Sequence, residues 1–474
     1  METSPQPQIM RLQAQARQLV AAGAWDQAVV VFEQLAVLSG DDINAHINHG
    51  NAHRHAGQLP AAVAVLARTY RRAPRHDRAR AALVDCLRVM GDLDQAAAIQ
   101  SEALVQTGTV AGWQDLGLLH LDRLAPSDAI AALDQGLALA PDEPTLLRDR
   151  GLAHLVAGRF NTGLRDYRAR WRLPDWSPLR DTPPFPWLGD QLPANNAPIL
   201  VVGEQGLGDM VLFSHALKTG AVANPIHLLV DQRLVGLMRQ THPWLRSVAS
   251  KLADPAHAAV AGWMGLIDFA GLVATDTGHD WPARRPSLQL IQPPPDRPGR
   301  DRPLIGVSWL SLGPDVGPLK SLTPDALQSV LALEGADFIS LQHGLDAAAL
   351  ARWDPHRRLQ PAPVEVTQDI QGLAQILCGL DGIIGVSNST IHLAGALNVP
   401  ALLPVHRGQR QLWYWAHVDQ QHRSRFYPSV EIWRPPLAGR WDGLATRAGT
   451  WLYARRHPAA DLTARQNLPT KGRP

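Results

Sequence analysis

The feature that most constrains this chain is a repeat of about 34 residues in its first third. Glycines recur at this spacing at Gly23, Gly57 and Gly91. Further columns of the same repeat are Ala28, Ala62, Ala96, Ala129 and Gly163; Gly50, Gly117 and Gly151; Phe32, Leu66, Leu133 and Tyr167; and Pro74, Pro141 and Pro174. Self-similarity at a fixed period indicates a repeat architecture, in which each unit buries its apolar face against the next.

The residue types in these columns predict paired helices. The small residues of the alanine column allow two antiparallel helices to approach closely, and the glycines that precede them suit the turn between the helices. The pattern resembles the tetratricopeptide repeat. We predict about five units within residues 1–175, the third weakened by Gln100 at an apolar position. A concave surface for a peptide or protein partner and a rigid spacer are both compatible with this array.

Composition excludes several classes of protein. A formal net charge of +2 over 474 residues does not call for a nucleic-acid partner. The two cysteines, Cys86 and Cys378, are far apart in apolar surroundings, which favours free thiols in a reducing compartment. The first residues lack the apolar core of a signal peptide, and no run of about 20 apolar residues could cross a bilayer. We therefore expect a cytoplasmic protein with no transmembrane segment.

The texture of the sequence changes after the repeats. Residues 176–197 are rich in proline and predict an extended linker, whose Trp176 and Trp187 suggest packing onto a domain. The later apolar runs PILVVG, IHLLVD, GLIDFA, PLIGVSW, DFISLQ, GIIGVS and VPALLP alternate with helical stretches and predict buried parallel strands. A proline-rich interruption at residues 292–303 predicts a hinge between two α/β lobes, 198–297 and 298–458, the second with a closing helix. Residues 459–474 are expected to form a tail.

The first predicted strand of this half ends in the glycine-rich turn GEQGLGDMVLF. Gly203, Gly206 and Gly208 would expose backbone N–H groups at the start of a helix near Asp209, which suits the close approach of an anion or a sugar. The glycine spacing does not match a dinucleotide-binding fingerprint. On this stretch alone, a simple helix N-cap at Asp209 is the favoured alternative.

A second polar cluster lies in GVSNSTIHLAGALNVP. Ser387, Asn388, Ser389 and Thr390 gather at the expected N-terminus of a short helix, where unsatisfied N–H groups favour a phosphate or diphosphate. The alternative is a well-capped helix with His392 as a buried histidine that has its hydrogen bonds satisfied.

These two motifs, in this order and after these strands, resemble the family-nine, heptosyltransferase-like glycosyltransferases. The likeness is strongest to the bacterial subgroup that carries N-terminal tetratricopeptide repeats. YRARWRL, PPFPWLGD, RFYPSV and RWDGL support it, so the resemblance extends over nearly the whole chain. It implies a GT-B fold of two Rossmann-like lobes, in which the first lobe faces the acceptor and the second binds a nucleotide sugar.

The resemblance also implies roles for individual residues. Asp209 matches the presumed general base, Lys320 matches a residue that contacts the donor phosphates, and His392 matches a histidine at the phosphate-facing helix. Many family members have an aspartate where this chain has Ser387. Further candidate contributors at the site are Gly206, Gly208, Glu204, Gln205, Arg407 and Trp413.

The expected activity is transfer of a sugar, hexosyl or heptosyl, from a nucleotide-sugar donor to a hydroxyl of a glycan, a lipid-linked saccharide or a protein. Asp209 would accept the proton, while Lys320 and the helix near Thr390 would stabilise the departing diphosphate. No metal or other cofactor is expected, because the second half has no D-x-D pair. The alternative is a transferase-like adaptor of weak or no activity, whose repeats bind a protein partner.

Overall fold

The computed structural model describes residues 6–174, 185–218, 222–252, 260–276, 288, 290, 301–311, 317–406, 412–435 and 441–456. The chain divides into two compact units: the first ends at Ala153, and the second begins at His154 and contains the rest of the described chain. Most of the predicted hinge, the predicted tail, Trp176 and Arg407 lie outside the described residues.

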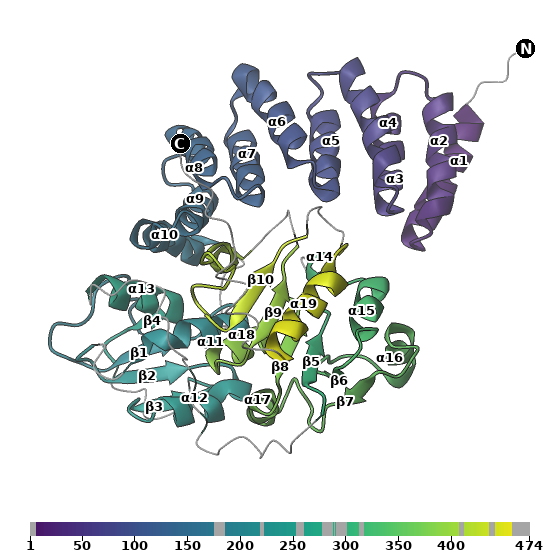
Figure 1. Ribbon diagram of the computed structural model, residues 1–474. Helices are drawn as coiled ribbons and strands as arrows, with labels where there is room; N and C mark the ends of the chain where they lie inside the picture. Colours follow the sequence, from purple (N-terminus) through teal and green to yellow (C-terminus); the bar gives the residue numbers. More distant parts are fainter. Residues whose placement is uncertain are drawn as a thin grey trace, which may run out of the picture. The chain divides into compact units, whose positions relative to one another are not determined.

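The N-terminal part is a helical repeat array in which successive helices from α1 to α8 pack against one another as antiparallel neighbours (Figure 1). Its helices are α1 (Gln6–Ala21), α2 (Trp25–Leu38), α3 (Ile43–His55), α4 (Leu59–Arg72), α5 (Asp77–Met90), α6 (Leu93–Thr107), α7 (Val110–Asp122), α8 (Pro126–Leu139) and α9 (Pro144–Val156). In the second unit, α10 (Phe160–Tyr167) and the 3₁₀ helix η1 (Arg168–Arg172) follow. The predicted tetratricopeptide-like pairing is confirmed.

The repeat columns have the predicted physical roles. Gly23, Gly57 and Gly91 lie in the turns between paired helices with φ of 68°, 76° and 87°, a region that glycine adopts without strain. Each alanine of the column from Ala28 to Ala129 is fully buried between helices. A Cβ atom added at Gly50 would lie 2.5 Å from Leu66 Cγ, so close helix packing requires a glycine there.

Gln100 does not leave an unsatisfied group in the third pair of helices. Its side chain on α6 is only 4% exposed, and its amide Nε2 donates to the carbonyl of Gly112 on α7 at 3.1 Å. A buried amide that is hydrogen-bonded avoids most of the desolvation penalty. The polar residue therefore joins the third and fourth pairs of helices.

The second unit contains two sheets in which every strand pairing is parallel. The first sheet has the order β3-β2-β1-β4. Its strands are β1 (Ile199–Val202), β2 (Ile226–Leu229), β3 (Ser247–Ala249) and β4 (Trp263–Gly265). Its helical segments are α11 (Leu207–Phe213), η2 (Ser214–Ala216), η3 (Gln232–Leu234), α12 (Val235–Thr241) and α13 (Leu266–Asp276).

The second sheet has the order β10-β9-β8-β5-β6-β7. Its strands are β5 (Leu304–Ser308), β6 (Asp337–Ser340), β7 (Leu359–Pro361), β8 (Gly382–Gly385), β9 (Ala401–Pro404) and β10 (Val430–Trp433). Its helical segments are α14 (Gly317–Lys320), α15 (Pro324–Leu331), α16 (Ala347–Trp353), α17 (Ile370–Cys378), α18 (Ser389–Ala396), η5 (Trp413–Ala416) and α19 (Leu444–Arg456).

One predicted strand was wrong. GLIDFA was expected to be a strand, but β4 ends at Gly265 and the remaining residues begin α13. An apolar run of this length does not distinguish a buried strand from a buried helix. Here the helix is apolar nearly all round because it packs on β1, β4, α10 and α11.

The core of the second sheet lies between its strands and the helices α15 and α19. Ile305, Phe338 and Ile384 from the strands pack with Leu327 of α15 and Trp451 of α19. The described end of the proline-rich linker adds a parallel bridge from Trp187 to Trp263 beside β4. The strand order reverses direction between β1 and β4 in the first sheet, and between β5 and β8 in the second. In parallel sheets, ligands bind beyond the carboxyl ends of the strands at such reversal points.

Candidate functional site

The turn that follows β1 is held by the end of the repeat array. Gln205 adopts a left-handed φ of 63°, and its amide Nε2 donates to the hydroxyl of Tyr167 at 2.9 Å. The preceding residue, Glu204, accepts two hydrogen bonds from the guanidinium of Arg170, at 2.7 and 2.9 Å. Both contacts fix the backbone that leads into α11. They therefore hold Gln205 in its left-handed conformation.

Glu204 belongs to a buried ion cluster and does not face an open site. The side chains of Arg170, Glu204 and Asp268 are all 0% exposed, and Arg170 lies 3.0 Å from Asp268 Oδ2. Burial alone would lower the pKa of Arg170, but Asp268 and Glu204 raise it above its usual value. Trp171 Nε1 also donates to Asp268, at 2.7 Å. These residues join η1, the turn after β1 and α13.

Asp209 occupies the first turn of α11 and remains partly exposed. Its Oδ2 accepts the backbone N–H of Gly206 at 3.2 Å, which caps the helix, and its Oδ1 accepts the hydroxyl of Tyr414 at 3.3 Å. Burial raises the pKa of Asp209 to about 6, although these two hydrogen bonds and Lys320 act in the opposite direction. Asp209 therefore combines a capping role with a raised pKa.

His392 lies on α18, directly against α11. It is 2% exposed, with Nδ1 3.1 Å from the hydroxyl of Tyr427 and Nε2 3.4 Å from that of Tyr414. Burial, with a contribution from Lys320, lowers the pKa of His392 to about 3, so the imidazole is neutral. A neutral ring with both nitrogens next to tyrosine hydroxyls is suited to orienting those hydroxyls and supplies no positive charge to a phosphate.

The two helices meet at Gly208. A Cβ atom at this position would lie 2.5 Å from His392 Cδ2, closer than real Cβ atoms come. Figure 1 shows α11 and α18 side by side, at the carboxyl ends of β1 and β8. Gly208 therefore permits the approach of the two sheets' helices, and Gly206 shapes the turn that precedes it.

The four polar residues before and at the start of α18 have different roles and different exposure. Asn388 is the N-cap: its Oδ1 accepts the N–H of Thr390 at 3.1 Å, and its Nδ2 donates to Ser308 Oγ of β5 at 2.7 Å. Ser387 is buried and accepts the indole N–H of Trp415 at 2.9 Å. Ser389 is partly exposed at the first helical position, whereas Thr390 is buried.

Lys320 ends the short helix α14 and is partly exposed. It lines a cavity of about 10 Å³ together with Ser387, His406 and Trp415, which has room for about one water molecule. Burial lowers the pKa of Lys320, and Asp209 partly opposes this shift. The ammonium group is therefore within electrostatic range of Asp209 and close to the residue that precedes the α18 cap.

Trp413 was a candidate for stacking on a ligand, but in the structure it is 7% exposed and packs among protein rings. Its neighbours include Phe160 of α10 at 6.1 Å, Phe213 of α11 at 6.3 Å and Phe426 at 5.5 Å between ring centroids. Its role is to hold η5 in place.

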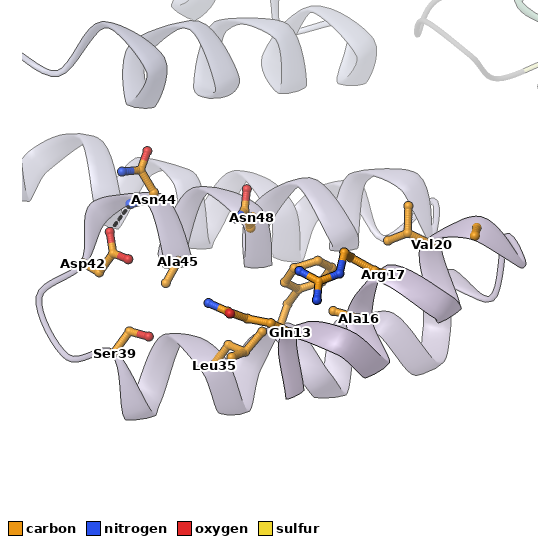
Figure 2. A pocket seen from close by; sticks show the side chains of 12 residues that line it. Gln13, Ala16, Arg17, Val20, Leu35, Ser39, Asp42, Asn44, Ala45 and Asn48 are labelled. Atoms are coloured by element: carbon orange, nitrogen blue, oxygen red, sulfur yellow. Dashed lines mark hydrogen bonds between the residues drawn. The ribbon is translucent and has the colours of Figure 1, made fainter. Parts of the chain in front are cut away.

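The first unit contains a separate pocket of about 620 Å³. Figure 2 shows its lining side chains, which come from α1, α2, α3 and the residues between α2 and α3. Gln13, Arg17 and Asn48 give it a polar side, whereas Phe32 and Leu35 give it an apolar one. Asp42, at its end, caps α3 by accepting the N–H of Asn44.

The described residues contain neither a cluster of metal ligands nor a membrane-spanning helix. No group of three or more histidine, cysteine, aspartate or glutamate side chains among them could hold a metal ion. Within the same residues, no helix has the length and apolar character needed to span a bilayer.

Comparison with known proteins gives one curated relative and a set of solved structures that resemble this chain. No protein-family model matches it. It is 25% identical over 413 residues to Protein FlbA of Caulobacter vibrioides, a match that takes in 72% of this chain and 66% of FlbA. The chain thus spans slightly less than two thirds of that relative.

Solved structures resemble the helical part. MamA (41-end) from Desulfovibrio magneticus RS-1 has a TM-score of 0.30 at 16% identity and covers 34% of this chain and 91% of its own. MamA MSR-1 gives 0.29 at 18% identity, with 34% of this chain and 94% of its own covered. Scores this low support no conclusion about this chain.

Sequence reasoning missed the residues that support the site. Tyr414, Tyr167, Arg170 and Asp268 were not among the candidates, although Tyr167 and Arg170 lie in YRARWRL, a stretch that carried the family resemblance. Hydrogen bonds from Tyr414 to Asp209 and from Arg170 to Glu204 join residues far apart in the chain, which no local pattern could indicate.

Proposed function

We propose that this protein is a metal-independent glycosyltransferase of GT-B type that moves a sugar from a nucleotide-sugar donor to a hydroxyl acceptor. The observation that carries the proposal is the position of Asp209. This partly exposed residue lies beyond the carboxyl end of β1, next to α18 and within electrostatic range of Lys320 from the second sheet. A base and an anion-binding helix are thus held together in one compact unit.

In the proposed reaction, the acceptor hydroxyl attacks the anomeric carbon while Asp209 takes its proton. The bond between that carbon and the diphosphate oxygen breaks, and the nucleoside diphosphate leaves. A carboxylate with a pKa of about 6 is ionised near neutral pH and still basic enough to accept a proton. The N–H groups of α18's first turn and the ammonium of Lys320 would stabilise the charge on the departing diphosphate.

The geometry refines the roles expected from the family resemblance. His392 is neutral and contacts two tyrosines, so the proposal gives it an orienting role. The hydroxyl of Ser387, where many family members have an aspartate, already accepts a hydrogen bond from Trp415. Because the cavity beside Lys320 holds only about 10 Å³, donor binding would require neighbouring side chains to move.

For the repeats, we propose binding of a protein or peptide that serves as acceptor or brings one. The pocket of about 620 Å³ in the first unit has the size of known ligand sites, and it offers amides and one arginine beside apolar side chains.

The test is a thermal-shift screen of the full chain against nucleoside diphosphates and nucleotide sugars, followed by transfer assays with the best ligand. A ligand at a hundred times its Kd should stabilise the protein by about 2.7 kcal/mol. We expect Lys320→Ala to lose this shift, and Asp209→Ala to keep it while losing transfer by roughly 10²-fold or more. Absence of a shift with every nucleotide would favour the adaptor alternative, in which the repeats alone bind a partner.

A further inference from the structure

Four side chains from four segments form a continuous chain of polar contacts that ends at Asp209. Tyr427 contacts Nδ1 of His392, Nε2 of His392 contacts the hydroxyl of Tyr414, and that hydroxyl donates to Asp209 Oδ1. The two tyrosines and the histidine are each less than 4% exposed, whereas Asp209 is partly exposed. The chain thus runs from the protein interior to its one partly exposed member.

We propose that Tyr414 is a positioning residue for Asp209, and that His392 and Tyr427 hold its hydroxyl in the donating orientation. This inference rests on the proposed function for its catalytic meaning, but the hydrogen-bond order that it requires can be measured without any substrate.

One arrangement of hydrogens satisfies every contact. If Tyr427 donates to Nδ1 of His392, the proton of the neutral ring must be on Nε2. That N–H then donates to the oxygen of Tyr414, which leaves the Tyr414 hydroxyl proton for Asp209. Burial keeps both tyrosines protonated by raising their pKa values well above the usual range, and the neutral state of His392 follows from its own lowered pKa.

The backbone around Tyr414 is held firmly enough for a positioning role. On one side of it, Trp413 packs on Phe160 of α10, and on the other, Trp415 donates to Ser387. The ring of His417 donates to the carbonyl of Leu155 at 2.8 Å. The end of the helical array and the segment before α18 therefore both fix η5, so the Tyr414 hydroxyl is presented to Asp209 by a rigid support.

The other groups that face Asp209 define what a change at Tyr414 should do. They are Lys320 of α14, the backbone N–H of Gly206, Tyr427 and, at the end of the repeats, Tyr167. Among the described groups, the backbone N–H groups of Gly206 and of Asp209 itself also donate to this carboxylate, alongside Tyr414. Loss of the Tyr414 hydroxyl removes a donor that stabilises the charged carboxylate and leaves the other groups in place, so the pKa of Asp209 should rise.

The experiment is a titration of the full chain labelled with ¹³C at aspartate carboxyl groups, in which the Asp209 signal is assigned as the one absent from Asp209→Asn. We expect a midpoint near pH 6 in the unaltered protein and a midpoint higher by about one pH unit in Tyr414→Phe. An unchanged midpoint in Tyr414→Phe would overturn the proposal.

Variants of His392 test the same hydroxyl without altering Tyr414. His392→Leu removes the donor that orients Tyr414 and should raise the Asp209 midpoint, whereas His392→Gln retains an N–H donor and should restore most of it. The ¹⁵N spectrum of His392 in the unaltered protein should show the Nε2–H tautomer above pH 7. An Nδ1–H tautomer there, or equal midpoints in the two variants, would contradict the hydrogen-bond order.

Activity gives a separate answer. If transfer is detected, the acid limb of kcat/KM should move with the Asp209 midpoint in Tyr414→Phe, while KM stays unchanged. A shifted titration in a protein that transfers no sugar would support the positioning role and refute the proposed function. A shifted titration with an unshifted pH profile in an active enzyme would refute a catalytic role for the Tyr414 contact.

Discussion

At the scale of single residues, the site depends on how closely α11 approaches α18. Gly208 is the residue at which they meet, and a methyl group there would collide with the ring of His392. His392 is fixed in turn by two tyrosines, so it cannot move aside without breaking the contacts that reach Asp209. A close backbone approach of this kind is a reason for glycine that is distinct from any need for positive φ.

Gly208→Ala should therefore lower the stability of the second unit by roughly 1–3 kcal/mol, as overpacking does in other cores. Gly206→Ala is the matched control in the same turn. Its φ is −91° and its added Cβ would lie 3.4 Å from Asp209 Oδ2, an ordinary contact. Thermal unfolding of both variants is the measurement, and equal melting temperatures would show that the helices do not meet as described.

Three histidines with lowered pKa values make the second unit sensitive to acid. Burial lowers the pKa of His392 to about 3 and those of His215 and His242 to about 4, against 6.5 in an unfolded chain. Between these values the unfolded state binds more protons, so stability falls as the pH decreases from about 6.5 toward 4. Asp209 acts in the opposite direction between pH 3.8 and about 6, because its folded pKa is raised, and offsets part of the effect.

We therefore expect Tm to be lower at about pH 5 than at about pH 7.5 by roughly 5 °C or more. His242→Leu removes one titrating ring that lies outside the candidate site, so the difference between the two pH values should shrink in this variant. Calorimetry at both pH values is the measurement. If the difference is the same size with and without His242, the histidine account is wrong.

The sequence indicated Asp209 and the cluster around Asn388 as candidate site residues, but it did not indicate Tyr414. Asp209 and the cluster around Asn388 follow β1 and β8, and strands of this kind can be recognised from their apolar runs. Tyr414 could not be found in the same way, because its partner is 205 positions away and its own segment, WYWA, shows only aromatic character. The N-cap interpretation of Asp209 was close: the residue caps α11 from within the first turn.

At the scale of elements, periodicity was reliable where one pattern repeats and weak where a short apolar run stands alone. The helix pairs follow the glycine and alanine columns closely, since each column has a packing reason. After Gly265, the run GLIDFA forms the start of α13, which is buried on nearly all sides. Nothing within the run itself distinguishes a strand from a helix. The buried polar residue Gln100 was expected to weaken its unit, yet a backbone carbonyl on the next helix satisfies it.

The most consequential element is η1, only five residues long. Arg170 faces two buried carboxylates, from the turn after β1 and from α13. Its removal would leave Glu204 without this counter-charge and Asp268 with the more distant Arg168, at 3.9 Å. Arg170→Met should destabilise the second unit by about 3–5 kcal/mol. Arg165→Met, an exposed change on the preceding helix, should alter stability by less than about 0.5 kcal/mol. Denaturant unfolding followed by tryptophan fluorescence compares them, and similar midpoints would refute a structural role for the cluster.

At the scale of the whole molecule, the division between the two units falls after Ala153, earlier than the end of the repeat pattern in the sequence. The sequence could not show this, because α10 keeps the repeat columns through Gly163 and Tyr167. Within the second unit, α10 contacts the segments on which Asp209 depends: Tyr167 accepts a hydrogen bond from Gln205, and Phe160 packs on Trp413.

A comparison of two truncated proteins tests this division. A fragment of residues 142–474 retains α9, α10 and η1, whereas a fragment of residues 176–474 begins at the predicted linker and loses Phe160, Tyr167 and Arg170. The first should unfold cooperatively, because each contact around the turn after β1 is present. The second leaves Glu204 and Asp268 buried without Arg170 and removes the ring that packs on Trp413, so it should melt at least about 10 °C lower or aggregate. Circular dichroism melts of the two fragments decide the matter. Equal stability would mean that the α/β unit is complete without the last helices, and that the boundary expected from the repeat pattern is the physical one.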